Sequence, residues 1–263
     1  MPTLSTDLLR LTISPAVGAG IADFSLKGPS GFFFPLMRRA APDEPNSSLL
    51  SSFFMLPWVN RICAGRFSFN NQPHTIRTNT SDGMAQHGDV RKRPWSLSSH
   101  TATSATLDFD SRSFADINWP WSFTARATYT LIPSPRGGTL AIDLSLRNTD
   151  AAPFPAACGH HPYFSRRLWN DADDLHLSMP VAAEYPLKDA SDHLRHWILY
   201  APHHHPENAA NPTPLSFIAV EPQSQVNDAL NLAAATGLAT TGTIPLSPGD
   251  PLTTRCEFTV EVH

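Results

Sequence analysis

Hydrophobic and polar residues alternate along several segments of this chain. Apolar or small residues occupy the odd positions from 123 to 131, with Thr or Arg between them, and Leu or Ile occupies the even positions from 140 to 146. A period of two is typical of a strand with one buried face. The Pro- and Gly-rich segment 133–138 has hairpin length, so we predict two neighbouring antiparallel strands. Weaker alternation predicts further strands at 9–13, 175–181 and 258–262.

Prolines are spread over the whole chain and should keep helices scarce. There are 25 of them, and each removes a backbone donor and clashes with the preceding helical turn. The one modest helical candidate is the Ala- and Leu-rich segment 227–235, which is followed by Gly237, whereas 38–46 is typical of an exposed loop. No shift in composition divides the chain. We therefore predict an all-β protein in which residues 1–263 form a single antiparallel sandwich domain.

Composition and charge narrow the class of partner. The chain has 263 residues, 41% of them hydrophobic and 16% charged, and its formal net charge is -4. It carries no basic stripe of the kind that nucleic acids require, so a neutral small molecule is the better partner. The N-terminus lacks a secretory pattern, and the longest apolar stretch, 52–59, is far too short for a membrane helix. We expect a cytoplasmic protein without membrane contact.

Three cysteines are odd in number and far apart in the sequence. Cys63, Cys158 and Cys256 therefore argue against a disulfide framework and against a clustered zinc site. We expect all three to be reduced and mostly buried. The run 203–205 is three consecutive histidines between prolines, and adjacent side chains do not converge on one ion, so we expect a solvated loop there.

The segment 159–164, Gly-His-His-Pro-Tyr-Phe, has the composition of a site. A histidine beside a proline and two aromatic residues is held rigidly, and an imidazole exchanges protons near neutral pH. His161 could therefore act as a general acid. The alternative is that His160 and His161 only cap the end of a strand.

Five further motifs accompany this segment between about residue 50 and the C-terminus. In chain order, the six are Asn60-Arg61-Ile62, Gly65-Arg66-Phe67-Ser68-Phe69, His87-Gly88 with Trp95 downstream, His161-Pro162-Tyr163-Phe164, Val220-Glu221-Pro222 and Leu246-Ser247-Pro248-Gly249. Each motif alone is weak. Six in this order make the chain resemble the aldose 1-epimerase (galactose mutarotase) family, whose members carry similar segments.

The resemblance implies a fold, an activity and four site residues. The fold is a galactose-mutarotase-like β-supersandwich of mostly antiparallel strands, and the activity is interconversion of the α and β anomers of a free aldose. His161 would be the general acid, Glu221 the general base, and Arg61 and His87 ligands of sugar hydroxyls. Removing the proton of the C1 hydroxyl and protonating the ring oxygen needs no metal or cofactor. The sequence has no Gly-rich phosphate loop and no nucleophile elbow.

Protonation states fit these roles if the two groups face each other. At its ordinary pKa an imidazole is only about a quarter protonated at pH 7, whereas a glutamate is ionised. A carboxylate nearby favours the imidazolium, so we expect Glu221 to face His161 across the sugar. His160 should point to the opposite face of a strand and be structural or exposed.

Other roles for these residues stay open at the level of sequence. Arg61 could be a surface arginine, but its place beside Trp58 and Asn60 in an apolar stretch favours a partly buried, ligand-facing guanidinium. Without the resemblance, His87 is a loop histidine. Trp58, Trp95 and Phe164 could stack on a sugar or pack in the core. The protein could also be a non-catalytic sugar-binding module of the same fold. With either function we expect a monomer or a homodimer.

Clustered cations raise a third possibility, an epimerase that acts on a sugar phosphate. The clusters are Arg91-Lys92-Arg93 and Arg166-Arg167. However, the segment 57–60 differs from the one that we associate with hexose-6-phosphate epimerases. A neutral sugar is therefore the first choice.

The chain departs from the family between its two expected catalytic residues. His161 and Glu221 are 60 residues apart (221 − 161), which is shorter than in the members it resembles, where this interval includes a sugar-binding aspartate. Asp189 and Asp192 do not lie in the corresponding pattern, so neither is assigned that role. We expect a more open cleft, a high KM and loose discrimination among aldoses, because one lost carboxylate contact weakens binding by roughly tenfold to a hundredfold.

Overall fold

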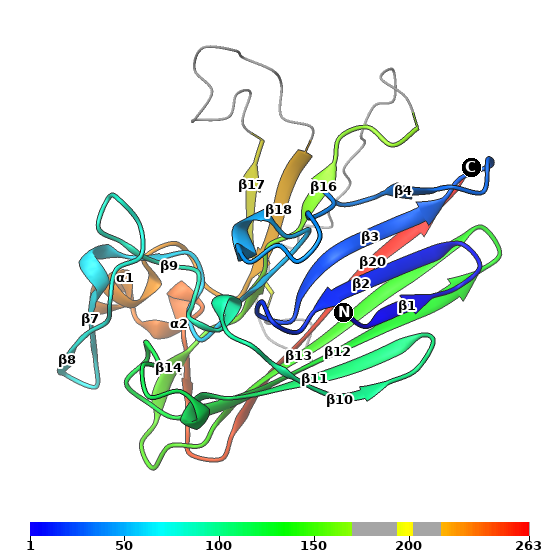
Figure 1. Cartoon of the computed structure of the whole chain (residues 1–263). Coiled ribbons are helices and arrows are strands. Elements are labelled where there is room, and N and C mark those ends of the chain that lie inside the picture. Colours follow the sequence, from blue (N-terminus) through cyan, green and yellow to red (C-terminus); the bar gives the residue numbers. More distant parts are fainter. Residues whose placement is uncertain (170–193, 202–216, 263) are drawn as a thin grey trace.

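The computed structural model describes residues 1–169, 194–201 and 217–262, and strands dominate it. The sheet with the longest strands, called the large sheet below, has five antiparallel strands in the order β10-β11-β12-β13-β20. These strands are β10 (Ser96–His100), β11 (Ser104–Asp110), β12 (Phe123–Ser134), β13 (Gly137–Asn148) and β20 (Pro251–Glu261). They run side by side along the length of the molecule (Figure 1).

The predicted hairpin is confirmed as β12 and β13, which pair over their full lengths around a turn at residues 135 and 136. The odd positions from 123 to 131 are buried and the even ones are partly or fully exposed, as the alternation predicted. Gly137, with a φ of 154°, follows the turn, and a Cβ there would lie 1.9 Å from the carbonyl oxygen of Val260. Glycine is therefore required for the close approach of β20.

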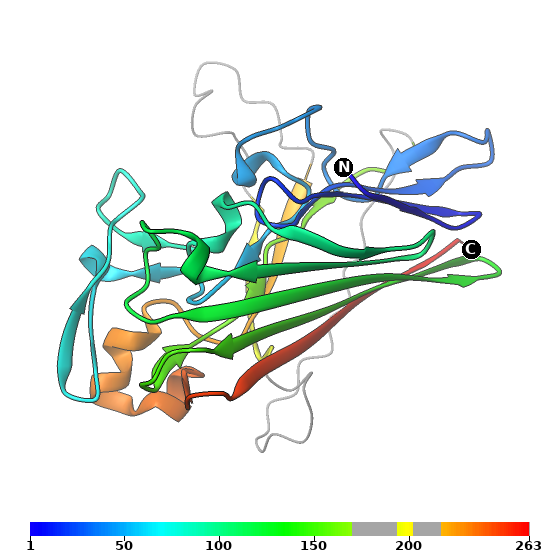
Figure 2. The same ribbon diagram turned by 60° about the horizontal axis from the view of Figure 1, so that its bottom comes forward.

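A second antiparallel sheet, in the order β1-β2-β3-β4, contributes to the same core. Its strands are β1 (Thr3–Ser5), β2 (Leu9–Ser14), β3 (Gly20–Lys27) and β4 (Phe33–Pro35). Side chains such as Leu11 and Phe24 are buried in one cluster with Leu131 and Leu140 of the large sheet. The Tyr129 hydroxyl donates a hydrogen bond of 2.6 Å to the carbonyl oxygen of Ala19, which precedes β3. Figure 2 shows the two sheets side by side.

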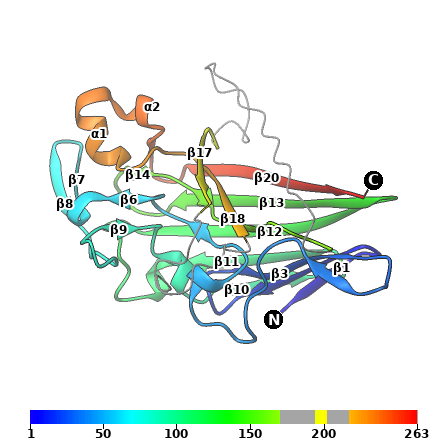
Figure 3. The same cartoon turned by 90° about the horizontal axis from the view of Figure 1, so that it is seen from above.

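A third sheet carries the segments around His161 and Glu221 and lies across the long strands (Figure 3). Its order is β16-β18-β15-β5, and β17 also pairs with β18. The strands are β5 (Phe54–Met55), β15 (Gly159–His160), β16 (Tyr163–Ser165), β17 (His196–Tyr200) and β18 (Phe217–Gln223). Strand β18 is therefore the element that brings the C-terminal part of the chain against the segment 159–165.

Shorter elements complete the fold. Three two-stranded pairs are β6 (Arg61–Ile62) with β9 (Ala85–Gln86), β7 (Arg66–Phe69) with β8 (Gln72–Thr75), and β14 (Phe154–Ala156) with β19 (Ile244–Leu246). The helices are α1 (Ala229–Thr236), α2 (Leu238–Thr241) and the 3-10 turns η1 (Ser47–Leu49), η2 (Cys63–Gly65), η3 (Val90–Lys92) and η4 (Ser111–Ser113). Figure 1 places α1 and α2 beside β7 at one end of the molecule.

Most local predictions agree with these elements. The predicted strand at 9–13 is β2, the one at 258–262 falls largely within β20, and the predicted helix is α1, shifted by about two residues. The three cysteines are free, although Cys63 is exposed. No helix among the described residues has the length and apolar character needed to cross a membrane. The predicted strand at 175–181, Asp189, Asp192 and the histidines 203–205 lie outside the described residues.

Candidate active site

His161 and Glu221 are in direct contact inside the third sheet. The Nε2 atom of His161 lies 3.1 Å from Oε1 of Glu221, and the two residues are 6% and 3% exposed. Glu221 thus faces His161 as expected, but in direct contact rather than across the space of a sugar. The strand register explains this contact, because β18 pairs Gln223 with Gly159 and Ala219 with Tyr163. Alternate residues share a face of a strand, so Glu221 faces the segment midway between these pairs, at residue 161.

The imidazole of His161 is held by its backbone and by aromatic rings. The backbone N–H of His161 donates a hydrogen bond of 3.0 Å to the carbonyl oxygen of Phe53. The Phe53 ring stacks on the imidazole with centroids 4.5 Å apart, and the Tyr163 ring lies 4.6 Å away. The Nδ1 atom is buried and has no hydrogen-bond partner among the described residues. The ring is therefore fixed with Nε2 directed at the carboxylate, to which an Nε2–H would donate.

Glu221 has a second buried neighbour on its own strand. The Nε2 amide group of Gln223 donates to Oε2 of Glu221 at 3.4 Å, and Gln223 is fully buried. This bond leaves the Oε1 atom of Gln223 buried without a partner in the described part of the chain. We did not select Gln223 from the sequence, although its position two residues after Glu221 on a strand was a usable signal.

His87 brings a second imidazole to this site. Its ring meets that of His161 edge-on, with centroids 5.1 Å apart. The residue adopts a φ of 61°, and its N–H donates to the carbonyl oxygen of Asn60 at 2.7 Å. Burial, reinforced by the neighbouring His161, Arg91 and Arg61, lowers the pKa of His87 well below its ordinary value. His87 is therefore neutral near pH 7 and suits hydroxyl binding better than proton donation.

Arg61 lies at the edge of the site beside His87. Strand β6 pairs Arg61 with Gln86, the residue before His87. The guanidinium is 37% exposed and forms an ion pair of 2.7 Å with Asp82. A hydrogen bond from Thr80, together with Arg61, lowers the pKa of Asp82. The sequence suggested a partly buried arginine, and the structure places it half-buried with an acidic partner that the sequence did not reveal.

The tryptophans considered for sugar stacking belong to the hydrophobic core instead. Trp58 stacks on Trp119 at 5.4 Å, and Trp95 packs against Phe54 and Phe109. Phe164 likewise packs edge-on against Phe258. The aromatic rings that line the His161–Glu221 pair are those of Phe53 and Tyr163.

His160 points to the opposite face from His161, as expected, and is buried rather than exposed. It is 1% exposed, and its ring meets Phe54 edge-on at 5.3 Å. Neither ring nitrogen has a partner among the described residues. Burial lowers the pKa of His160 to about 4, so the residue is neutral in the folded protein at neutral pH.

Acid should destabilise the fold through His160. The unfolded chain binds a proton at this residue below pH about 6.5, and the folded chain does so only below about 4. Stability is therefore full above pH 6.5 and falls as the pH drops toward 4, with about 2 kcal/mol lost between pH 7.5 and 5. Between pH 7.5 and 5, the free energy of unfolding of the H160L variant should fall by about 2 kcal/mol less than that of the native protein, as measured by urea unfolding at both pH values. H100L changes an exposed histidine and should leave the pH dependence unaltered; an unaltered dependence in H160L as well would contradict the prediction.

The described residues offer no second catalytic site, either in a cavity on the large sheet or as a metal cluster. A cavity of about 510 Å³ lies on the large sheet between Asp108, Arg126 and Arg147. Asp108 forms an ion pair of 2.6 Å with Arg126 there, so the charges compensate each other and form no free acid/base pair. Within 1–169, 194–201 and 217–262, no three His, Cys, Asp or Glu residues are arranged to hold a metal ion.

Comparisons with solved structures agree with this architecture. A GalM/aldose epimerase homologue from C. elegans superposes with a TM-score of 0.71 at 16% identity, covering 100% of this chain and 99% of that one. A galactose mutarotase-like protein from Clostridium acetobutylicum superposes with a TM-score of 0.69 at 14% identity, covering 98% and 95%. At such identities the likeness establishes the fold, which is galactose-mutarotase-like.

Sequence comparisons are consistent with the fold. The Escherichia coli protein YihR, described as uncharacterized, is 27% identical over 177 residues, which are 66% of this chain and 53% of YihR. YphB of the same organism, also described as uncharacterized, is 28% identical over 115 residues, or 43% of this chain and 37% of YphB. The matched part of this chain thus spans about half or less of these relatives. The model of the aldose 1-epimerase family matches residues 3–209, and the chain belongs to that family.

Proposed function

We propose that this protein is an aldose 1-epimerase that interconverts the α and β anomers of an aldose with a free anomeric hydroxyl. The observation that carries the proposal is the buried contact of 3.1 Å between Nε2 of His161 and Oε1 of Glu221. The reaction must move protons at two oxygens bonded to the same carbon, O1 and the ring oxygen. A donor and an acceptor that lie this close together can reach both oxygens of one sugar.

In the proposed mechanism Glu221 removes the proton of the C1 hydroxyl while His161 protonates the ring oxygen through Nε2. The bond between C1 and the ring oxygen breaks, and the open-chain aldehyde forms. Rotation about the C1–C2 bond exposes the other face of the carbonyl. The ring oxygen then returns its proton to His161 as it attacks C1, and Glu221 gives its proton to O1. Every proton is returned, so the enzyme needs no co-reactant.

Neighbouring residues support these roles by position and charge. Gln223 donates to the second oxygen of Glu221 and so fixes the orientation of the carboxylate. Phe53 and Tyr163 fix the imidazole of His161. We assign His87, which is neutral, and Arg61, at the edge of the site, to sugar hydroxyls. A non-catalytic sugar-binding protein would have no need of a buried acid/base pair.

Polarimetry tests the proposed function directly. Freshly dissolved α-anomers of glucose, galactose, glucose 6-phosphate and glucuronate should each be followed with and without protein in a weakly catalytic buffer. We expect at least one sugar to reach its equilibrium rotation faster in proportion to protein concentration. If no sugar on this panel were accelerated, the protein would not be a mutarotase of these aldoses.

A further inference from the structure

Two arginines next to the site form no ion pair with a carboxylate among the described residues, although Glu44 acts on the Arg38 guanidinium from a longer distance. Arg91 is 5% exposed and Arg38 is half-buried. Neither forms an ion pair within those residues, and the Nε atom of each is buried without a hydrogen-bond partner there. Burial lowers the pKa of both guanidinium groups. Burying a cation without a counter-ion is costly, so such a pair needs an explanation.

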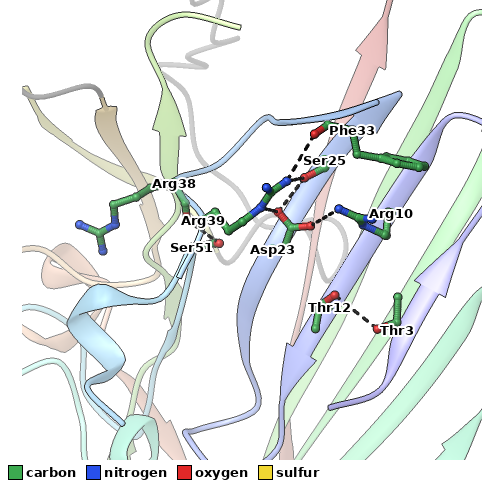
Figure 4. Close-up of polar contacts among 9 residues, drawn as sticks. All are labelled: Thr3, Arg10, Thr12, Asp23, Ser25, Phe33, Arg38, Arg39 and Ser51. Atoms are coloured by element: carbon green, nitrogen blue, oxygen red, sulfur yellow. Dashed lines mark hydrogen bonds and ion pairs between the residues drawn. The ribbon is translucent and has the colours of Figure 1, made fainter. Parts of the chain in front are cut away.

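The neighbouring residue Arg39 shows how the chain balances an arginine elsewhere. Its Nε lies 2.8 Å from Asp23, whose carboxylate is also 3.3 Å from Arg10 and accepts a hydrogen bond from Ser25. Figure 4 shows Arg38 extending away from this cluster, on the other side of the segment. Arg38 and Arg39 are adjacent, yet only Arg39 uses an acidic partner.

Arg38 and Arg91 converge on the same turn, η1. Arg38 donates through Nη2 to the carbonyl oxygens of Ser48 and Leu50, at 2.6 and 2.9 Å. Arg91 donates through Nη1 to the hydroxyl of Ser48 at 3.0 Å. These acceptors are neutral, so the two positive charges are placed close together without being neutralised.

The same two guanidinium groups lie against the aromatic rings that line the site. Arg38 is 4.0 Å from the centroid of the Tyr163 ring, and Arg91 is 4.9 Å from that of Phe53. These are the two rings that pack on the imidazole of His161. Arg91 also contributes to the lowered pKa of His87. The positive charge therefore acts on the space beside the acid/base pair.

We propose that the substrate is an aldose bearing an oxyanion substituent remote from C1, such as a phosphate, carboxylate or sulfonate, and that Arg38 and Arg91 bind it. This inference rests on the proposed function. Guanidinium groups present forked N–H donors that match an oxyanion, and the anion would supply the ion-pair partner that neither arginine has among the described residues. Glu221 is not that partner, since its oxygens contact His161 and Gln223 rather than either arginine.

The structure distinguishes among the clustered cations that could bind a phosphate. Of the cluster 91–93, only Arg91 is buried without an ion pair. Lys92 is exposed, and Arg93 forms ion pairs with Asp89 and Asp116. Arg166 is exposed. Arg38, which lay in a segment expected to be an exposed loop, is the partner that sequence did not suggest.

The test compares kcat/KM for glucose, glucuronate, glucose 6-phosphate and a glucose carrying a sulfonate at C6, measured by polarimetry or by NMR exchange between the anomers. We expect at least one anionic sugar to exceed glucose by tenfold or more, and the best of the three identifies the oxyanion. R38Q and R91Q should each lower kcat/KM for that sugar by about tenfold to a hundredfold. Both should lower the value for glucose by a clearly smaller factor than the value for that anionic sugar. R38K and R91K should recover part of the loss.

R39Q is the matched control, because it removes the neighbouring arginine that is paired with Asp23. It should leave kcat/KM unchanged for both glucose and the anionic sugar. Equal turnover of glucose and the anionic sugars would overturn the inference and leave the proposed function intact. An equal loss for charged and neutral sugars in folded R38Q and R91Q would also overturn it, since it would indicate a structural role. Saturation-transfer NMR detects sugar binding even when no anomer exchange occurs. Charge-selective binding without any anomer exchange would support the inference while contradicting the proposed function.

Discussion

The Glu221→Gln variant is expected to catalyse anomer exchange about 10²–10⁴-fold more slowly than the native protein, because a positioned general base contributes that much. Glutamine has the shape of glutamate and can still accept a hydrogen bond from Nε2 of His161, but it cannot take the proton of the C1 hydroxyl. The loss should appear in kcat for the best substrate on the panel. Circular dichroism and thermal melting should show a folded protein.

Glu257→Gln is the matched control for this variant. Glu257 lies exposed on β20 and accepts a hydrogen bond of 2.8 Å from Arg255, so the same chemical change there should leave kcat unaltered. A folded Glu221→Gln protein with near-native kcat would show that another group serves as the base. Loss in both variants would indicate instability rather than chemistry.

The His161→Asn variant should lose kcat by a similar factor, about 10²–10⁴-fold, since asparagine cannot protonate the ring oxygen. Polarimetry with the best substrate measures it, and His100→Asn, a change of an exposed histidine, serves as control. Residues that act as a unit have effects that do not add. The double variant with Glu221→Gln should therefore be little slower than either single variant.

His87 is the alternative proton donor that this experiment must exclude. Its lowered pKa leaves it neutral near pH 7, which makes it a poor acid, so His87→Asn should act mainly on KM. If activity survived His161→Asn but was lost in His87→Asn, the acid would be His87, and the assignment made from the 3.1 Å contact would be wrong.

Sequence alone determined the local elements of this protein. The alternation at 123–131 and 140–146 gave the correct hairpin, because the pleat of a strand imposes a period of two on any chain that buries one face. The same period placed His160 and His161 on opposite faces. The ordered motifs indicated the family. Each of these features depends on neighbours within a few residues, so the sequence carries it directly.

The resemblance led us to expect Glu221 opposite His161, but the contact itself is a property of the tertiary structure. Glu221 contacts His161 because of the register of β18 with β15 and β16, and nothing near either residue in the sequence encodes that register. The same holds for the arginines. Arg38 and Arg39 are chemically identical and adjacent, but Arg39 pairs with Asp23 whereas Arg38 contacts Ser48 and Tyr163. Whether a charge is balanced by an acid or left for a ligand depends on long-range packing, which local pattern does not specify.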